Sequence, residues 1–345
     1  MKTITKTVSI VLLGLALTAC GGGGESTNDN TSSDTTTADE YKAMTEALLS
    51  GEVDGVSPYD INTVSEFNVA NNADSALAIE QLNAIRKRVG LMEVKTNTLL
   101  EKSATNHANY LTDVATSYNT LMGHYEDNSN YPSDFYTGRD VTTRVAHTQM
   151  DLSNYNGVDE DLVYGTASSK QSLKSLMVAI YHRFSLLSFD TVEAGAGNKG
   201  LSWVFNIANQ TSAQKFSNAI VVYPSANQKE VTREFVEESP DPLPNTSFSG
   251  NPISIAFNPN NFGSIEILSF KLFKVEDGEN TEVGNTLLMD KSNDPHGKFT
   301  TKQFALFPLD PLEASTTYHV EVEYLNNDNE KSKSWEFTTT EGWTF

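Results

Sequence analysis

The sequence predicts an α/β layer fold followed by an all-β sandwich in a chain of 345 residues. Between residues 73 and 238, apolar side chains recur at helical spacing in several segments that alternate with a few strands. Beyond the prolines of residues 240–244 the spacing changes to two, as in residues 318–324. Because proline-rich segments are typical of domain boundaries, we expect the domains to separate within residues 239–246 and the second to span residues 247–345.

Residues 1–20 have the pattern of a lipoprotein signal peptide. Lys2 and Lys6 precede an apolar stretch, residues 8–17, that is too short to span a bilayer. Residues 17–20, LTAC, match a lipobox, so we expect cleavage before Cys20 and acylation of that cysteine. A resemblance to bacterial lipoproteins, in which a residue such as Gly21 favours the outer membrane, implies an outer-membrane lipoprotein. The alternative is an ordinary signal peptide that contains a cysteine by chance.

The composition restricts the classes of partner. The net charge of −21 argues against nucleic acid and against charge-driven binding to anionic membranes, so the lipid on Cys20 is the expected membrane contact. Cys20 is the only cysteine, so disulfides within the chain cannot stabilise it. Residues 21–40 are polar and of low complexity, which predicts a disordered tether, and residues 41–72 are predicted to form an irregular lead-in.

The first domain is expected to begin with two amphipathic helices. Residues 78–89 carry an apolar stripe that ends at Gly90. Asn97 is the expected N-cap of a second helix, whose inner face includes Leu100 and neighbouring alanines. His107 lies beside this inner face, where a packed histidine bonded to backbone is the favoured interpretation.

A third helix is expected over residues 172–187. His182 falls on the face opposite its apolar stripe, so this histidine is either exposed or turned into a cleft. The glycine-rich residues 195–200 fit GxGxxG, but they follow a helix and precede a strand, which favours a turn over a dinucleotide site. Residues 201–209 and 219–223 are expected to be strands that pair as a hairpin.

Several short motifs occur in the first domain: LNAIRKRVGL (82–91), HANYL (107–111), GHYE (123–126), FYTG (135–138), EDLV (160–163), YHR (181–183) and GAG (195–197). In their order and spacing they resemble the CAP superfamily of cysteine-rich secretory, antigen 5 and pathogenesis-related proteins, in a bacterial form without cysteines. The resemblance implies an α-β-α sandwich with a cleft lined by two histidines and acidic residues.

The resemblance also implies a candidate site. His124 matches the first cleft histidine, Glu160 the family's motif glutamate, and His182 the second histidine. The second family glutamate has no clear match, and Glu126, close to His124 in the sequence, is the candidate to replace it. Two imidazoles and one carboxylate suit zinc or another divalent metal with an open position, which makes His124, Glu160 and His182 the expected ligands. The alternative is a hydrogen-bonded polar cleft without a metal.

The second domain resembles bacterial Ig-like modules, on the evidence of residues 309–324 and 334–343. Modules of this kind usually act as spacers or as binding surfaces, and the resemblance implies no chemistry for the second domain.

Three functions are compatible with these features. The first is an exported, lipid-anchored envelope protein whose cleft binds a small ligand, such as a lipid, glycan or peptide, and a divalent metal. The second is a metal-dependent hydrolase or peptidase that uses a metal-bound water at the cell surface. The third is a structural or adhesive protein whose Ig-like domain engages another envelope protein. The missing acid and the absence of a recognisable nucleophile favour the first.

Overall fold

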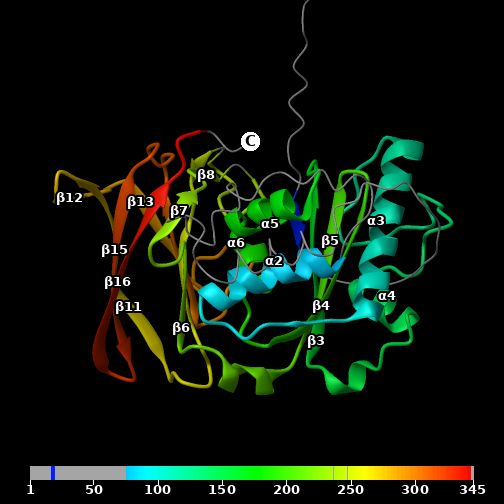
Figure 1. Ribbon diagram of the computed structural model, residues 1–345, viewed down its shortest axis with the longest axis horizontal. Coiled ribbons are helices and arrows are strands. Elements are labelled where there is room, and N and C mark those ends of the chain that lie inside the picture. The colour runs from blue at the N-terminus through cyan, green and yellow to red at the C-terminus, as the bar shows by residue number, and fades with distance from the viewer. Residues whose placement is uncertain (1–16, 20–74, 236, 247, 343–345) are drawn as a thin grey trace, which may run out of the picture.

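The computed structural model describes residues 17–19, 75–235, 237–246 and 248–342 (Figure 1). Cys20, the tether expected over residues 21–40 and the lead-in expected over residues 41–72 lie outside these residues. Within the described part of the chain, no helix has both the length and the apolar character needed to cross a bilayer.

The first region is a mixed α/β structure with helices on both faces of one sheet (Figure 1). Its sheet has the order β1-β3-β5-β4-β2. Ala108 of the long second helix shares an apolar cluster with Leu162 and Val204 on one face. On the other face, the first helix and the helix after β3 share a cluster with Ala196 and Phe205. The elements are α2 (Ser75–Arg88), β2 (Lys95–Thr96), α3 (Thr98–Tyr118), α4 (Val141–His147), η1 (Leu152–Asn154), β3 (Gly157–Tyr164), α5 (Ser169–Val178), α6 (Ile180–Leu186), β4 (Thr191–Lys199) and β5 (Ser202–Asn209), preceded by β1 (Leu17–Ala19).

The first two predicted helices are confirmed. The stripe expected over residues 78–89 is buried in α2, and Gly90 follows it with a φ of 82°. Asn97 caps α3, because its side-chain oxygen accepts from the backbone N–H groups of Leu99 and Leu100 at 2.8 and 3.3 Å. Local sequence signals therefore predicted these two helices of the α/β layers correctly.

The single helix expected over residues 172–187 is wrong, because the chain breaks at Ala179 into α5 and α6. Ala179 has φ −72° and ψ 114°, which is extended backbone. The carboxylate of Glu238 accepts the N–H groups of Ile180 at 2.8 Å and Tyr181 at 3.2 Å, so α6 has its own cap. The apolar stripe continues across the break, which is why periodicity alone did not reveal it.

The turn expected over residues 195–200 is also wrong for most of its length. Gly195 and Gly197 belong to β4, and only Gly200, with a φ of 55°, lies in the turn between β4 and β5. A Cβ at Gly195 would lie 2.1 Å from the backbone nitrogen of Glu101, and one at Gly197 would lie 2.3 Å from that of Thr105. The glycines therefore permit α3 to lie directly against the sheet.

The second region is a β-sandwich of two sheets, with the orders β13-β14-β10-β6 and β12-β11-β15-β16-β7. Ile255 and Leu306 of the first sheet share one apolar core with Val320 and Trp335 of the second. The expected order, an α/β region followed by a mostly β region, is confirmed. The elements are η2 (Thr211–Phe216), β6 (Ile220–Tyr223), β7 (Gln228–Val231), β8 (Glu234–Phe235), β9 (Ser249–Gly250), β10 (Ile253–Phe257), β11 (Ile265–Glu276), β12 (Glu279–Glu282), β13 (Thr286–Met289), β14 (Gln303–Pro308), β15 (Thr317–Asn326) and β16 (Asn329–Thr339).

The chain enters the sandwich earlier than the prolines indicated. β6 pairs with β10, with Val222 opposite Ile255, and β7 pairs in parallel with β16. The hairpin expected between residues 201–209 and 219–223 does not form, because β5 pairs with β3 and β4 instead. Residues 220–235 therefore belong to the sandwich, although they precede the prolines. An alternating pattern identifies a strand but not its partner, which explains the error.

Candidate functional site

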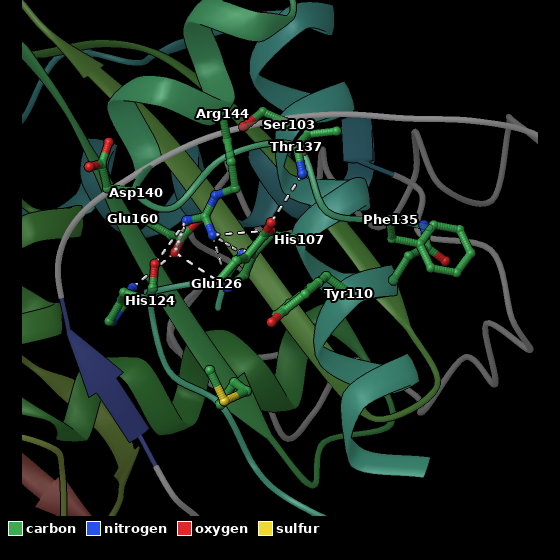
Figure 2. Close-up of polar contacts among 12 residues, drawn as sticks. Ser103, His107, Tyr110, His124, Glu126, Phe135, Thr137, Asp140, Arg144 and Glu160 are labelled. Carbon is green, nitrogen blue, oxygen red and sulfur yellow. Dashed lines mark hydrogen bonds and ion pairs between the residues drawn. The ribbon is translucent and has the colours of Figure 1, made fainter. Parts of the chain in front are cut away.

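Five buried polar side chains meet on the α3 face of the sheet (Figure 2). They are His107 of α3, His124 and Glu126 of the following loop, Arg144 of α4 and Glu160 of β3. His124 is 4% exposed, and the other four are 1% exposed or less. Of the predicted site residues, this network brings His124, Glu126 and Glu160 together, as the sequence led us to expect.

Arg144 is the centre of the network. Its Nη2 group donates to both carboxylate oxygens of Glu160 at 2.9 Å, and its Nη1 group donates to Glu126 Oε1 at 3.3 Å. Burial raises the pKa of Glu160, but the charges of Arg144 and His107 and the hydrogen bond from His124 outweigh burial and lower it to about 2. Glu160 is therefore ionised and held by a buried, charge-assisted pair.

Both histidines of the network contact a carboxylate, and the contacts of His124 define its tautomer. His124 Nδ1 lies 2.9 Å from the ionised Glu160, so it carries the proton and donates it. His107 Nε2 lies 3.2 Å from the carbonyl of Gly123, so this nitrogen also carries a proton. His107 Nδ1 contacts Glu126 at 2.9 Å and also Arg144. His107 is packed and bonded to backbone as expected, but it also contacts a carboxylate and a guanidinium of this network.

His124 stays neutral at physiological pH. Burial lowers its pKa to about 4, although the hydrogen bond to Glu160 and the charge of that residue oppose the shift. Its other nitrogen, Nε2, is buried and makes no hydrogen bond within the described part of the chain. This nitrogen is an acceptor, since the ring proton is on Nδ1.

His182 pairs with an acid outside this network. It is 0% exposed, and its Nδ1 lies 3.0 Å from the carboxylate of Glu238, which follows β8 in the chain and is 1% exposed. The charge of His182 contributes to lowering the pKa of His124. Among the described residues, no group of such side chains could hold a metal ion, so the structure gives no support to His124, Glu160 and His182 as three shared ligands. A residue 56 positions away supplies the acid beside His182, which no local motif could show.

The donors of the network do not fit zinc. The carboxylate of Glu160 is occupied by Arg144 and His124, and the buried guanidinium beside it would repel a cation. Across the described residues, no group of three or more His, Cys, Asp and Glu side chains could hold a metal ion. Arg144, which the sequence analysis missed, is thus the residue that decides the character of this site.

A cavity of about 190 Å³ lies on the other side of β3. It is bounded by residues 159–161 of β3, by α6 and by residues of the sandwich. Asp161, 1% exposed, lies in its wall and accepts from Ser185 Oγ at 2.9 Å. Burial raises the pKa of Asp161 to about 7, against the charge of His182 and the bond from Ser185. Side chains alternate along a strand, so Asp161 and its neighbour Glu160 serve opposite faces.

Comparison with known proteins gives a limited result. No protein-family model and no curated protein matches the chain. The structure is similar to an extracellular protein of Bacillus anthracis that contains an SCP domain, with 15% identity and a TM-score of 0.31. It is also similar to a cysteine-rich secretory protein of Staphylococcus aureus, with 17% identity and a TM-score of 0.29. Each match covers 41% of this chain and 41% of the other. At this level the likeness carries no conclusion about ligand or activity.

Proposed function

We propose that this chain is an exported, lipid-anchored binding protein of the cell envelope, and that its small-ligand site is the cavity between the mixed α/β region and the sandwich. The observation that carries the proposal is the cavity itself, about 190 Å³ in volume and walled by both regions. Polar groups that converge on a cavity between domains are typical of small-molecule sites. In this proposal the mixed region is a CAP-like domain and the sandwich is an Ig-like module that completes the site.

The buried network supports a scaffold role rather than hydrolysis. Its carboxylates are bonded to Arg144 and to histidines, and all five side chains are closed to solvent. A hydrolytic site needs a group that can reach the substrate and a water positioned to attack. The metal-dependent hydrolase therefore has no support from these residues. Added zinc and added chelator are expected to leave the melting temperature unchanged, and a zinc-dependent rise would contradict this assignment.

The cavity assignment can be tested by filling the cavity. Thr300 lines it and is exposed, so Thr300→Trp should occupy part of its volume without disturbing a core. The readout is the rise in melting temperature caused by millimolar amino acids, monosaccharides or short fatty acids. We expect at least one compound to stabilise the wild-type chain and to lose its effect in Thr300→Trp. The matched control is Thr301→Trp, at an exposed neighbour outside the cavity wall.

The lipid anchor is a separate part of the proposal, carried by the lipobox at residues 17–20, and cleavage before Cys20 would remove β1 from the edge of the mixed sheet. Cys20→Ser should release the protein from the outer-membrane fraction or leave the precursor uncleaved. Palmitate labelling and cell fractionation measure both results. Equal membrane retention of the variant, with no label on the wild-type protein, would remove the anchor from the proposal.

A structural or adhesive role is the second candidate. The expected partner surface was the Ig-like domain, and that remains a proposal. One observation instead favours the mixed region: Tyr118, Leu121 and Tyr125 are 40%, 57% and 49% exposed and lie close together in the sequence. Exposed apolar groups of this kind are common at contact surfaces. Pull-down from envelope extracts with Leu121→Asp as the comparison would test that role.

A further inference from the structure

The two walls of the cavity differ in charge. The wall formed by β3 carries Asp159 and Asp161, and the wall formed by the sandwich carries Lys298 and the polar residue Thr300. Phe184 of α6 adds an apolar surface, held in place by its edge-to-face contact with Phe299 at 5.0 Å. The cavity therefore offers acidic, basic and apolar contacts at once.

Asp161 has one carboxylate oxygen available to a ligand. Its Oδ2 accepts from Ser185, and this is the only side-chain hydrogen bond that the described residues give to the carboxylate. The residue is nevertheless 1% exposed and lines the cavity. A buried carboxylate with a single donor is costly, which is consistent with the elevated pKa of this group. A cationic donor bound in the cavity would complete its coordination.

Asp159 is less available than Asp161. Its Oδ2 accepts from Asn209 Nδ2 at 2.6 Å, and its side chain is only partly buried. Glu160, between the two aspartates, directs its carboxylate to Arg144 on the other face of the sheet. Asp161 is thus the acid that is both buried and incompletely bonded, and it sets the position of a ligand cation.

The volume limits the size of the ligand. A cavity of 190 Å³ equals the liquid volume of roughly six water molecules. It is smaller than the usual range for drug-sized ligands, so the occupant is a compact molecule of about ten non-hydrogen atoms or fewer.

We propose that this cavity binds a free amino acid or a zwitterion of similar size, with its ammonium group on Asp161 and its carboxylate group on Lys298. The inference rests on the proposed small-ligand function and specifies the ligand class. A simple amine would leave Lys298 without a counter-charge, and a simple carboxylate would face two aspartates. A neutral sugar would supply no cation for Asp161. A zwitterion supplies an opposite charge to the acidic wall and to the basic wall, and Phe184 would contact its side chain.

The test is calorimetric titration of the full chain in detergent with a panel of free L- and D-amino acids. Each amino acid that binds is compared with its N-acetyl derivative, which lacks the ammonium, and its methyl ester, which lacks the carboxylate. We expect both derivatives to bind more weakly by about tenfold or more, since each loses one charge-assisted contact.

Two variants assign the contacts. Asp161→Asn should abolish binding of the free amino acid while the chain remains folded, because asparagine matches the aspartate in shape. Lys298→Met should weaken the binding of the free amino acid but leave the affinity for its methyl ester unchanged. The matched control is Lys291→Met, at an exposed lysine outside the cavity wall, which should bind as the wild type does.

The outcomes separate this inference from the proposed function. One outcome is that a sugar or a fatty acid stabilises the chain, loses this effect in Thr300→Trp, and no amino acid binds. The cavity is then a ligand site, but the assignment of a zwitterion as its ligand is wrong. The assignment of a zwitterion also fails if the N-acetyl and methyl ester derivatives bind as tightly as the free amino acid. If no compound of any class binds, both proposals fail.

Discussion

Glu160 and Asp161 show how one position along a strand decides the behaviour of a carboxylate. Both are 1% exposed, so burial disfavours the charge on each. Glu160 faces Arg144 and His124, and its pKa falls to about 2. Asp161 faces the opposite side, where Ser185 is the one side-chain donor that the described residues supply, and its pKa rises to about 7. One carboxylate is thus anchored in the scaffold, and the other remains available.

Asp161→Asn is expected to stabilise the protein at alkaline pH. The folded pKa of Asp161 lies above its unfolded value, so the wild-type chain loses stability as pH rises from about 4 through about 7. Asparagine does not ionise and avoids this loss, which is on the order of a few kcal/mol. Urea unfolding at pH 5 and pH 8 measures the effect, with exposed Asp134→Asn as the control. The assignment would be contradicted if the difference in unfolding free energy between the variant and the wild type were the same at pH 5 and at pH 8.

Arg144→Met should strongly destabilise the fold. Removing the guanidinium leaves the buried carboxylates of Glu126 and Glu160 without their cation, a change that typically costs about 3–5 kcal/mol. Arg139→Met is the matched control, because Arg139 is exposed and lies over the ring of Tyr125 at 4.9 Å. The control should cost about 1 kcal/mol or less. Equal losses in the two variants, measured by urea unfolding, would show that the network is not a scaffold.

The secondary-structure elements were predictable where their signals were local. Asn97 as a cap and the stripe of α2 are properties of a few neighbouring residues, and both predictions were correct. The break at Ala179 was not predictable, because Glu238, the group that caps α6, lies 58 residues from Ile180. For the same reason, the acid beside His182 could not be identified. This histidine is 0% exposed, so an exposed position, one of the two that its helical face indicated, is wrong.

Glu238→Ala should destabilise the chain by roughly 1–3 kcal/mol. The carboxylate caps α6 and bonds to His182, so its loss leaves two backbone N–H groups and one imidazole with unmet hydrogen bonds in a buried place. The adjacent Glu237 is exposed, and Glu237→Ala is therefore the matched control. Thermal and urea unfolding of both variants measure the difference. A loss of stability as large in the control would rule out a specific role for Glu238.

The candidate site was predictable only in part. Motif resemblance joined His124 with Glu160 and Glu126, and the structure confirms that these side chains share one network. Arg144 gave no comparable signal, since an arginine on a short helix is ordinarily a surface residue. Asp161 had a usable signal that was overlooked. Successive side chains of a strand face opposite sides, so Glu160 and Asp161 in the run Asp159–Asp161 could not share one partner.

At the scale of the whole molecule, the order of the regions was predictable and the boundary was not. Period-two patterning correctly identified a β-rich second half. However, β6 and β7 lie before the prolines and still join the two sheets of the sandwich. Helix α6 adds further connections, since Arg183 Nη1 donates to the carbonyl of Pro252 at 2.6 Å and Tyr181 donates to Asp294 at 2.5 Å. The prolines therefore mark a connection within a shared structure.

These connections predict that a chain cut within residues 239–246 will stay together. A specific protease site inserted after the exposed Asn245 would give an upstream fragment that contains β6 and β7 and a downstream fragment that contains β10 and β16. Each fragment alone would lack a strand that its sheet requires, and the apolar core shared by Val222, Val231 and Ile255 would be divided.

We therefore expect the two fragments to elute as one species under native conditions and to separate only in denaturant. The uncut chain with the same insertion is the control for any effect of the added residues. If the cut chain separates on a native column into fragments that each unfold in a cooperative transition, the prolines are a true domain boundary after all. In that case the ligand cavity, which needs walls from both regions, could not survive in either fragment.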